Sequence, residues 1–302
     1  PFNKIRPDFL KYKINNLAIF DDCFSSKKER LYEFCKKISD LRKQPPWNLT
    51  WHCQILVTVV DDDMLKTMRE AGCETISYGF ESFSPIVLKS MKKPITPELI
   101  DKAIKLTLKH NMSPRGHFIF GDIAETKETA KTTLDYWKKE TKGQIGLSMV
   151  QPYPGSNIYA YCIEKGLIKD KLNYIKYKMD PNNNINMTSM EEKDFNKLRM
   201  EILDTYGKNI PFVSPLFIKQ EDNKDVYSIE AKCPFCSHLT TYKNCSIPNK
   251  SNYDFYLICR NCHYRFFIAS PLKKFVYKHY SSLESLKNIY KKFNKSIKKS
   301  KL

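Results

Sequence analysis

The sequence lacks any long apolar segment. A membrane-spanning helix needs about 20 consecutive apolar residues, whereas the densest apolar run is Ile55-Leu-Val-Thr-Val-Val60. The first residues, Pro1 to Asp8, also lack the apolar stretch of a secretory signal peptide. A hydrophobic content of 41%, with 13% aromatic residues, excludes a disordered chain. We therefore expect a soluble, cytoplasmic protein without a transmembrane segment.

Arginine is scarce for so basic a chain. The 302 residues include 51 Lys and Arg against 33 Asp and Glu, a net charge of +18, yet only eight of the 51 are arginine. Arginine suits bidentate contacts with phosphates and bases, whereas lysine is the general cation of protein surfaces. The charge thus indicates compositional bias more than a dedicated nucleic-acid surface. Nucleic-acid binding through the basic C-terminus is kept as an alternative.

Short apolar runs alternate with helical patterns from Asn15 to about Leu167. Strands are predicted at residues 17–20, 51–60, 75–78, 117–120 and 145–150. Helix starts follow at Ser26-Lys-Lys-Glu29, which has capping-box spacing, at Asp61 to Asp63, at Thr96-Pro97 and at Thr126. Such repetition predicts right-handed βαβ units and a parallel sheet, in an open or a barrel arrangement. In both arrangements the chemistry lies at the carboxyl ends of the strands.

Five cysteines gather between residues 233 and 262, and four of them form two C-x-x-C pairs. Cys233-Pro-Phe-Cys236 and Cys259-Arg-Asn-Cys262 are separated by 22 residues. Four thiolates can close a tetrahedron around Zn²⁺, and each short turn supplies two of them. The spacing predicts a structural zinc ribbon over residues 229–270, with redox or disulfide pairs as the alternative. The five scattered cysteines, of which Cys23 is the first, are expected to be buried free thiols.

The rest of the chain is less regular. Residues 1–170 are predicted to form the α/β domain and residues 171–228 a helical extension and linker. One more helix is expected from Met190 to Tyr206, and a loop at 182–184. Residues 271–302 read as a lysine-rich amphipathic tail, which is typical of a solvated helix face.

Several ordered motifs resemble the core of radical S-adenosylmethionine (SAM) enzymes. They are Ile19-Phe-Asp-Asp-Cys-Phe24, Trp51-His-Cys-Gln54, Ala71-Gly-Cys-Glu-Thr-Ile-Ser-Tyr-Gly-Phe-Glu-Ser82, Phe118-Ile-Phe-Gly-Asp-Ile-Ala-Glu-Thr126 and Gln151-Pro-Tyr-Pro-Gly-Ser156. The resemblance covers roughly residues 10–170 and favours the branch that often carries an N-terminal cobalamin-binding domain. It implies a partial (β/α)6 barrel that binds SAM beside a [4Fe-4S] cluster. Such an enzyme generates a 5′-deoxyadenosyl radical or supports cobalamin-linked methyl transfer; the substrate and the use of cobalamin are left open.

The resemblance assigns roles to residues at the strand ends. It implies that Asp21 and Asp22 contact the amino group of the cofactor and that Glu81 lies near its ribose. Gly121 to Glu125 match the motif near the adenine, and Gln151 approaches the same end. From the residues alone, a lone glutamate at a strand end, such as Glu81, is more often a solvated or structural group, and Glu125 is equally the start of the next helix. One position departs from the family: Leu56 stands where related sequences often carry arginine.

The C-x3-C-x2-C motif that holds the family's cluster is absent from the sequence. Without three thiolates at that spacing there is no radical initiation. We therefore expect the C-terminal part of a radical SAM enzyme, lacking the first barrel strand and the cluster loop, that is inactive by itself. The alternative is a degenerate barrel that acts as a nucleic-acid or protein binding module through its basic zinc ribbon. In a mixed case, the ribbon delivers a macromolecular substrate to the radical site.

Overall fold

The structure is a computed structural model that describes residues 11–12, 14–21, 24–44, 48–179, 184–222, 225–249, 252–279 and 282–283. The chain divides into two compact units. The first comprises residues 1–190 and 262–264, and the second comprises residues 191–261 and 265–302.

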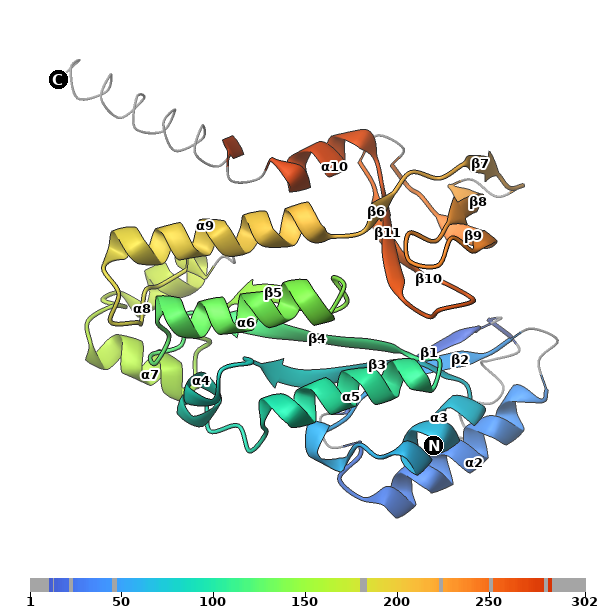
Figure 1. Ribbon diagram of the computed structural model, residues 1–302, viewed down its shortest axis with the longest axis horizontal. Helices are drawn as coiled ribbons and strands as arrows, with labels where there is room; N and C mark the ends of the chain where they lie inside the picture. The colour runs from blue at the N-terminus through green and yellow to red at the C-terminus, as the bar shows by residue number, and fades with distance from the viewer. Residues whose placement is uncertain are drawn as a thin grey trace. The chain divides into compact units, whose positions relative to one another are not determined.

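A five-stranded parallel sheet organises the first unit (Figure 1). Its strands, in both chain order and spatial order, are β1 (Asn16–Ile19), β2 (Thr50–Gln54), β3 (Cys73–Glu81), β4 (Ser113–Phe120) and β5 (Gly146–Met149). A doubly wound sheet reverses its strand order at a switch point, and this sheet does not. Consecutive right-handed crossovers place the connecting helices on one side, as in a barrel. The predicted α/β class and partial-barrel arrangement are confirmed.

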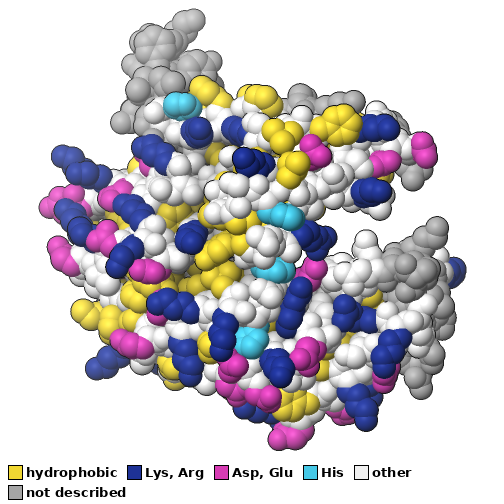
Figure 2. All heavy atoms as spheres, turned by 45° about the vertical axis from the view of Figure 1, so that its right-hand side comes forward, with side chains coloured by type: hydrophobic (Ala, Val, Ile, Leu, Met, Phe, Trp, Pro, Cys, Tyr) yellow, Lys and Arg dark blue, Asp and Glu magenta, His cyan; other side chains and the backbone are white. Residues whose placement is uncertain are grey.

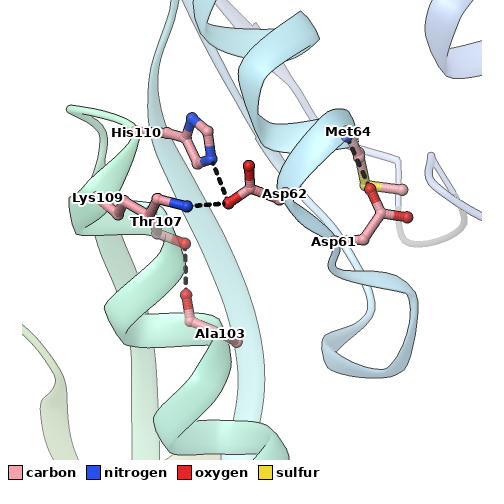
Figure 3. A network of polar contacts seen from close by, with 7 residues as sticks. All are labelled: Asp61, Asp62, Met64, Ala103, Thr107, Lys109 and His110. Carbon is pink, nitrogen blue, oxygen red and sulfur yellow. Dashed lines mark hydrogen bonds and ion pairs between the residues drawn. The ribbon is translucent and has the colours of Figure 1, made fainter.

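The connecting helices begin at residues that can cap them. They are α2 (Lys28–Arg42), α3 (Asp62–Glu70), α4 (Pro85–Ser90), α5 (Pro97–Lys109) and α6 (Lys127–Glu140). Asp61 accepts a hydrogen bond of 2.8 Å from the Met64 amide at the start of α3 (Figure 3). Thr126 and Thr129 form a reciprocal capping box at the start of α6. The capping box expected from Ser26 does not form, because α2 has Lys27 as its N-cap residue and no side-chain cap.

Large apolar side chains fill the space between the helices and the sheet. Trp51 of β2 packs edge-on against Phe34 of α2, with ring centroids 5.0 Å apart. The hydroxyl of the buried Tyr78 in β3 lies 2.6 Å from that of Thr107 in α5. Opposite Tyr78 in β4 is Gly116, with φ of +152°, where an added Cβ would lie 2.6 Å from the Tyr78 carbonyl oxygen. Strands β3 and β4 therefore pair this closely only because residue 116 has no side chain.

The apolar run predicted as one strand over residues 51–60 divides into two elements. Strand β2 ends at Gln54, and a 3₁₀ turn, η1 (Val57–Val59), follows. Ile55, Val57 and Val60 are nevertheless buried. Burial of a connection, rather than strand pairing, is the reason for the continuous apolar character of this segment.

Helices α7 (Asn157–Glu164) and α8 (Lys171–Asn173) and the π-helical turn η2 (Tyr174–Lys178) complete the described part of the first unit. Tyr159, Cys162, Ile168 and Tyr174 form a small core with Val150, the residue after β5. The loop expected at residues 182–184 includes residues 182 and 183, which lie outside the described residues.

The second unit contains two small sheets and two helices. One sheet has the order β10 (Asp254–Ile258), β11 (Arg265–Ala269), β6 (Phe212–Val213), and the other has the order β7 (Phe217–Gln220), β8 (Val226–Lys232), β9 (Leu239–Ser246). Strands β6 and β7 and the start of β8 lie within the stretch expected to be a linker. Helix α9 (Glu192–Asn209) matches the helix predicted from Met190 to Tyr206 and runs three residues further.

Helix α10 (Pro271–Lys278) opens the predicted basic tail. It approaches α9 closely at Gly207, where an added Cβ would lie 2.1 Å from the Tyr277 carbonyl oxygen. Most of the tail lies outside the described residues, so the amphipathic helix predicted there stays a prediction. None of the helices in the described part of the chain is both long enough and apolar enough to cross a membrane.

Candidate functional site

The two faces of the parallel sheet differ in character. Side chains alternate along a strand, so the residues between Trp51, Tyr78, Phe118 and their buried neighbours face away from the helix layer. That second face is mostly polar, with Ala18 and Ile119 as apolar members, and its polar and glycine residues are half-buried or exposed: His52, Gln54, Ser77, Gly79, Glu81, Arg115, His117, Gly146 and Ser148. A polar, accessible face on a sheet whose other face is a packed core is suited to bind a ligand.

Glu81 ends β3 and is held in an uncommon conformation. Its φ is +61°, in the left-handed region that non-glycine residues seldom adopt. Its Oε1 forms an ion pair of 2.7 Å with Nζ of Lys93, and its side chain is only 16% exposed. Gly79 lies beneath the pair, because a Cβ there would be 3.0 Å from the Glu81 oxygen and 3.4 Å from the Lys93 nitrogen. A strained residue with a fixed carboxylate at a strand end is a candidate binding group.

The loop after β4 buries the carboxyl group of Glu125 among its own backbone groups. Oε1 accepts a hydrogen bond of 2.6 Å from the Thr129 hydroxyl, and the Gly121 amide lies 3.4 Å from Oε2. Burial raises the pKa of Glu125 to about 7, although these two hydrogen bonds oppose the shift. Asp122 is also buried and accepts a hydrogen bond of 2.9 Å from the Ala124 amide. Glu125 therefore shapes the loop, and Gly121, with φ of +95°, makes its turn.

His52 and Arg115 interact electrostatically on the polar face. Burial lowers the pKa of His52, and the positive charge of Arg115 lowers it further. On β5, Gly146 leaves room for the ring of His117, because a Cβ would lie 2.3 Å from one of its carbons. Leu56, at the position where related sequences often carry arginine, is 47% exposed and brings no charge. Arg115 and Lys93 are cations that this face does provide.

The remaining predicted cofactor residues lie at two other strand ends. Asp21, two residues after β1, forms an ion pair of 2.5 Å with Arg30 of α2. Asp22 lies outside the described residues. Gln151 follows β5, and its Oε1 lies 3.5 Å from the hydroxyl of the buried Tyr174. Glu81 at the end of β3, and Asp21, Gly121, Glu125 and Gln151 just after their strands, thus share the carboxyl edge of the sheet, while their individual roles stay predictions.

Sequence reasoning missed Lys93, His52, Arg115 and His117. Lys93 lies in the connection between α4 and α5, and no motif marks it. Arg115 and His117 alternate with buried residues along β4, but the apolar run was read as a strand only from residue 117. The period-two alternation beginning at Ser113 was the signal that could have shown them.

The four paired cysteines come together in the structure. The ligand atoms of Cys233, Cys236, Cys259 and Cys262 all lie within 4.8 Å of one another. The sulfurs of Cys236 and Cys259 are 3.6 Å apart, close to the edge of about 3.8 Å of a tetrahedron with Zn–S bonds of about 2.3 Å. Their arrangement therefore fits a tetrahedral Zn²⁺ ion.

Both cysteine pairs lie in similar turns. The Phe235 amide is 3.4 Å from the Cys233 sulfur, and the Asn261 amide is 3.4 Å from the Cys259 sulfur. The residue after the second cysteine has positive φ in each turn, +62° at Ser237 and +58° at His263. Amide donors aimed at the sulfurs favour the thiolate form that a metal requires.

Basic and acidic side chains are mixed on the surface of the described residues that Figure 2 shows. Lysines and arginines alternate with aspartates and glutamates on that face instead of forming one large basic area. The net charge of +18 therefore does not mark a nucleic-acid site on the face in view, and contact through the basic C-terminus stays a prediction.

Comparison with known proteins agrees with this architecture. The Radical SAM superfamily matches residues 14–136. An uncharacterized methyltransferase of Pyrococcus horikoshii is 31% identical over 172 residues, which are 57% of this chain and 36% of the relative. The bacteriochlorophyllide d C-12(1)-methyltransferase of Chlorobaculum tepidum is 26% identical over 141 residues, 46% of this chain and 30% of that enzyme.

Among solved structures, the apo form of the cobalamin-dependent S-adenosylmethionine radical enzyme OxsB superposes with a TM-score of 0.50. Its identity is 15%, over 68% of this chain and 36% of the other, so this likeness concerns the fold alone. The match of residues 14–136 to the Radical SAM superfamily agrees with the resemblance that the motifs indicated. The chain spans about a third of the length of the two curated relatives.

Proposed function

We propose that the chain is part of a radical SAM methyltransferase and provides the nucleoside-binding side of its barrel. The observation that carries the proposal is the match of residues 14–136 to a superfamily whose strand order is seen here, with a polar face and Glu81 at its carboxyl edge. Methyl transfer is supported by the names of the relatives from Pyrococcus horikoshii and Chlorobaculum tepidum.

The residues present fit the nucleoside part of SAM. Glu81 provides carboxylate lone pairs for ribose hydroxyls, and the loop from Gly121 to Glu125 offers backbone to the adenine. Gln151 borders the same edge from β5. When bound in such an enzyme, the cofactor supplies either a radical or a methyl group. The role of the chain is to bind and orient it.

The residues present do not fit a [4Fe-4S] cluster. Between residues 1 and 190 the described cysteines, Cys35, Cys53, Cys73 and Cys162, are all buried. Burial raises the pKa of Cys35 to about 12 and raises that of Cys73 as well, so both stay thiols rather than thiolates. The four-cysteine centre has the spacing of a zinc site. We therefore infer that the cluster ligands lie outside this sequence and that the 302-residue chain does not cleave SAM by itself.

Anaerobic reconstitution tests this proposal. The full chain is treated with ferrous iron and sulfide, given SAM and dithionite, and assayed for 5′-deoxyadenosine. We expect SAM to bind without forming product, and we expect product once a segment bearing C-x3-C-x2-C is joined ahead of Pro1. The Cys259→Ser variant, reconstituted in parallel, identifies iron that binds at the four-cysteine centre. Product from the chain alone, or failure of SAM to bind, contradicts the proposal.

We propose that the four-cysteine centre binds a structural Zn²⁺ ion. We also propose that the protein is cytoplasmic. A closed set of four thiolates leaves no open position for a substrate, which favours a structural role. The nine described cysteines are free thiols in the structure.

A further inference from the structure

Glu81 and Lys93 form an ion pair that none of the sequence motifs indicates. Glu81 ends a strand of the recognised domain, whereas Lys93 lies in the connection between α4 and α5 and belongs to no motif. Their ion pair of 2.7 Å is half-buried, with side-chain exposures of 16% for Glu81 and 39% for Lys93. A pair so shielded from water orients its carboxylate more firmly than an exposed surface pair does.

Lys93 is itself fixed by the end of helix α4. Its amide donates to the Leu88 carbonyl oxygen at 2.9 Å, while Lys92, with φ of +54°, terminates the helix in the left-handed conformation. This is the hydrogen-bond pattern with which helices commonly end, and it fixes where the next side chain departs. The ammonium group of Lys93 therefore reaches Glu81 from an anchored backbone.

The ion pair occupies one carboxylate oxygen of Glu81 and leaves the other available. Lys93 contacts Oε1. A Cβ at residue 79 would lie 3.0 Å from this oxygen, so a side chain there would crowd it. Among the residues that the structure describes, Oε2 is left to accept hydrogen bonds from a ligand. An ionised carboxylate only accepts, so it selects a ligand that presents hydroxyl donors.

We propose that Lys93 is a positioning residue that holds Glu81 for the vicinal hydroxyls of a ribose, and that Gly79 makes room for this arrangement. The inference rests on the proposed function, which places a nucleoside cofactor at this edge. Without Lys93, the carboxylate turns toward solvent and discriminates poorly between a ribose and a deoxyribose. Lys93 thus sets sugar selectivity without touching the sugar.

Calorimetric titration of the full chain tests the proposal, with S-adenosylhomocysteine and its 2′-deoxy analogue as probes. The wild-type chain should bind the 2′-deoxy analogue about tenfold or more weakly than S-adenosylhomocysteine, because the analogue lacks one hydroxyl donor to the charged carboxylate of Glu81. Lys93→Met should weaken S-adenosylhomocysteine binding by about tenfold and bring the two affinities close together. Lys93→Arg should restore part of the preference for ribose. Lys92→Met, which removes the same charge from the neighbouring exposed residue, should leave both affinities unchanged.

Glu81→Gln separates this role from a general effect of charge. Its affinities should resemble those of Lys93→Met. The double variant should lose little further affinity, because both changes remove the same interaction. Thermal unfolding of each variant shows that the fold is retained. Wild-type preference for ribose in Lys93→Met overturns the inference while leaving the proposed function intact. Failure of the wild-type chain to bind either probe overturns both.

Discussion

The four-cysteine centre and the polar face of the sheet are built in opposite ways. The cysteine ligands come from two short turns, and each turn carries its own amide-to-sulfur contact and its own residue of positive φ. The polar face takes single residues from β2, β3, β4 and β5, which span almost a hundred residues of sequence. One centre is defined by local geometry and the other by the register of a parallel sheet.

This difference concerns stability as well as position. The strands next to the cysteine turns belong to small sheets of three strands each, so a metal that binds four thiolates would supply much of the folding free energy of this region. The first unit has a packed core of Trp51, Phe80, Phe118 and Trp137 between its sheet and helices, and this core needs no ligand. We therefore expect ligand loss to unfold the region around the cysteines and to leave the sheet intact.

Loss of a cysteine ligand should have the largest effect. Cys259→Ser removes one of four thiolates, so the metal content should fall from about one ion per chain to none. The region around the four cysteines should lose several kcal/mol of unfolding free energy. Elemental analysis and differential scanning calorimetry measure both quantities, and the transition of the sheet unit should not move. Cys245→Ser is the matched control, because Cys245 is half-buried and lies outside the cluster. Equal metal content in both variants would show that the cluster is not a metal site.

A buried carboxyl group should make the sheet unit depend on pH. Burial raises the pKa of Glu125 from 4.5 to about 7, so the folded state holds its proton more tightly than the unfolded state. Stability from this group is present below about pH 4.5 and is lost as pH rises through about 7. Relative to Glu125→Gln, the wild-type chain should lose up to about 3 kcal/mol between about pH 4.5 and about pH 8.

Urea unfolding across this pH range measures that difference. Glu128→Gln is the control, because Glu128 starts the same helix in an exposed position where its pKa is lowered instead. Its stability difference from wild type should therefore change in the opposite direction. A pH-independent difference for Glu125→Gln would mean that the carboxyl group is hydrated in the folded protein.

The contrast between the two regions also explains what could be predicted from the sequence. The spacing of Cys233, Cys236, Cys259 and Cys262 was sufficient to locate a cluster, because each C-x-x-C turn closes on itself. The five strands were found because each contributes apolar residues to the buried face that packs against the helices. The end of β2 was not found, because Ile55, Val57 and Val60 are buried in a connection and look like a continued strand.

The ion pair of Lys93 with Glu81 could not be predicted from any local pattern. It depends on how far α4 extends before Lys92 ends it, and on the absence of a side chain at Gly79 two residues before Glu81. The same holds for His52 and Arg115, which come from different strands and meet only when the sheet forms. Short strands such as β6, with two residues, are equally hidden, since pairing with the distant β11 defines them.

The smallest effect is expected for an ion pair between helices α3 and α5, which belongs neither to the four-cysteine centre nor to the polar face. Asp62 at the start of α3 accepts from Lys109 at 2.6 Å and contacts His110 Nε2 at 3.0 Å, both at the end of α5 (Figure 3). The hydrogen bond from Lys109, and then that from His110, lowers the pKa of Asp62, so any stabilisation is present at neutral pH and is lost as pH falls through the lowered pKa. The Asp62 side chain is 54% exposed, and salt screens such pairs. Asp62→Asn should therefore lower the melting temperature slightly at low ionic strength, and the decrease should vanish in high salt and in acid. A decrease that persists in high salt would show that this network, and not the apolar core alone, holds α3 against α5.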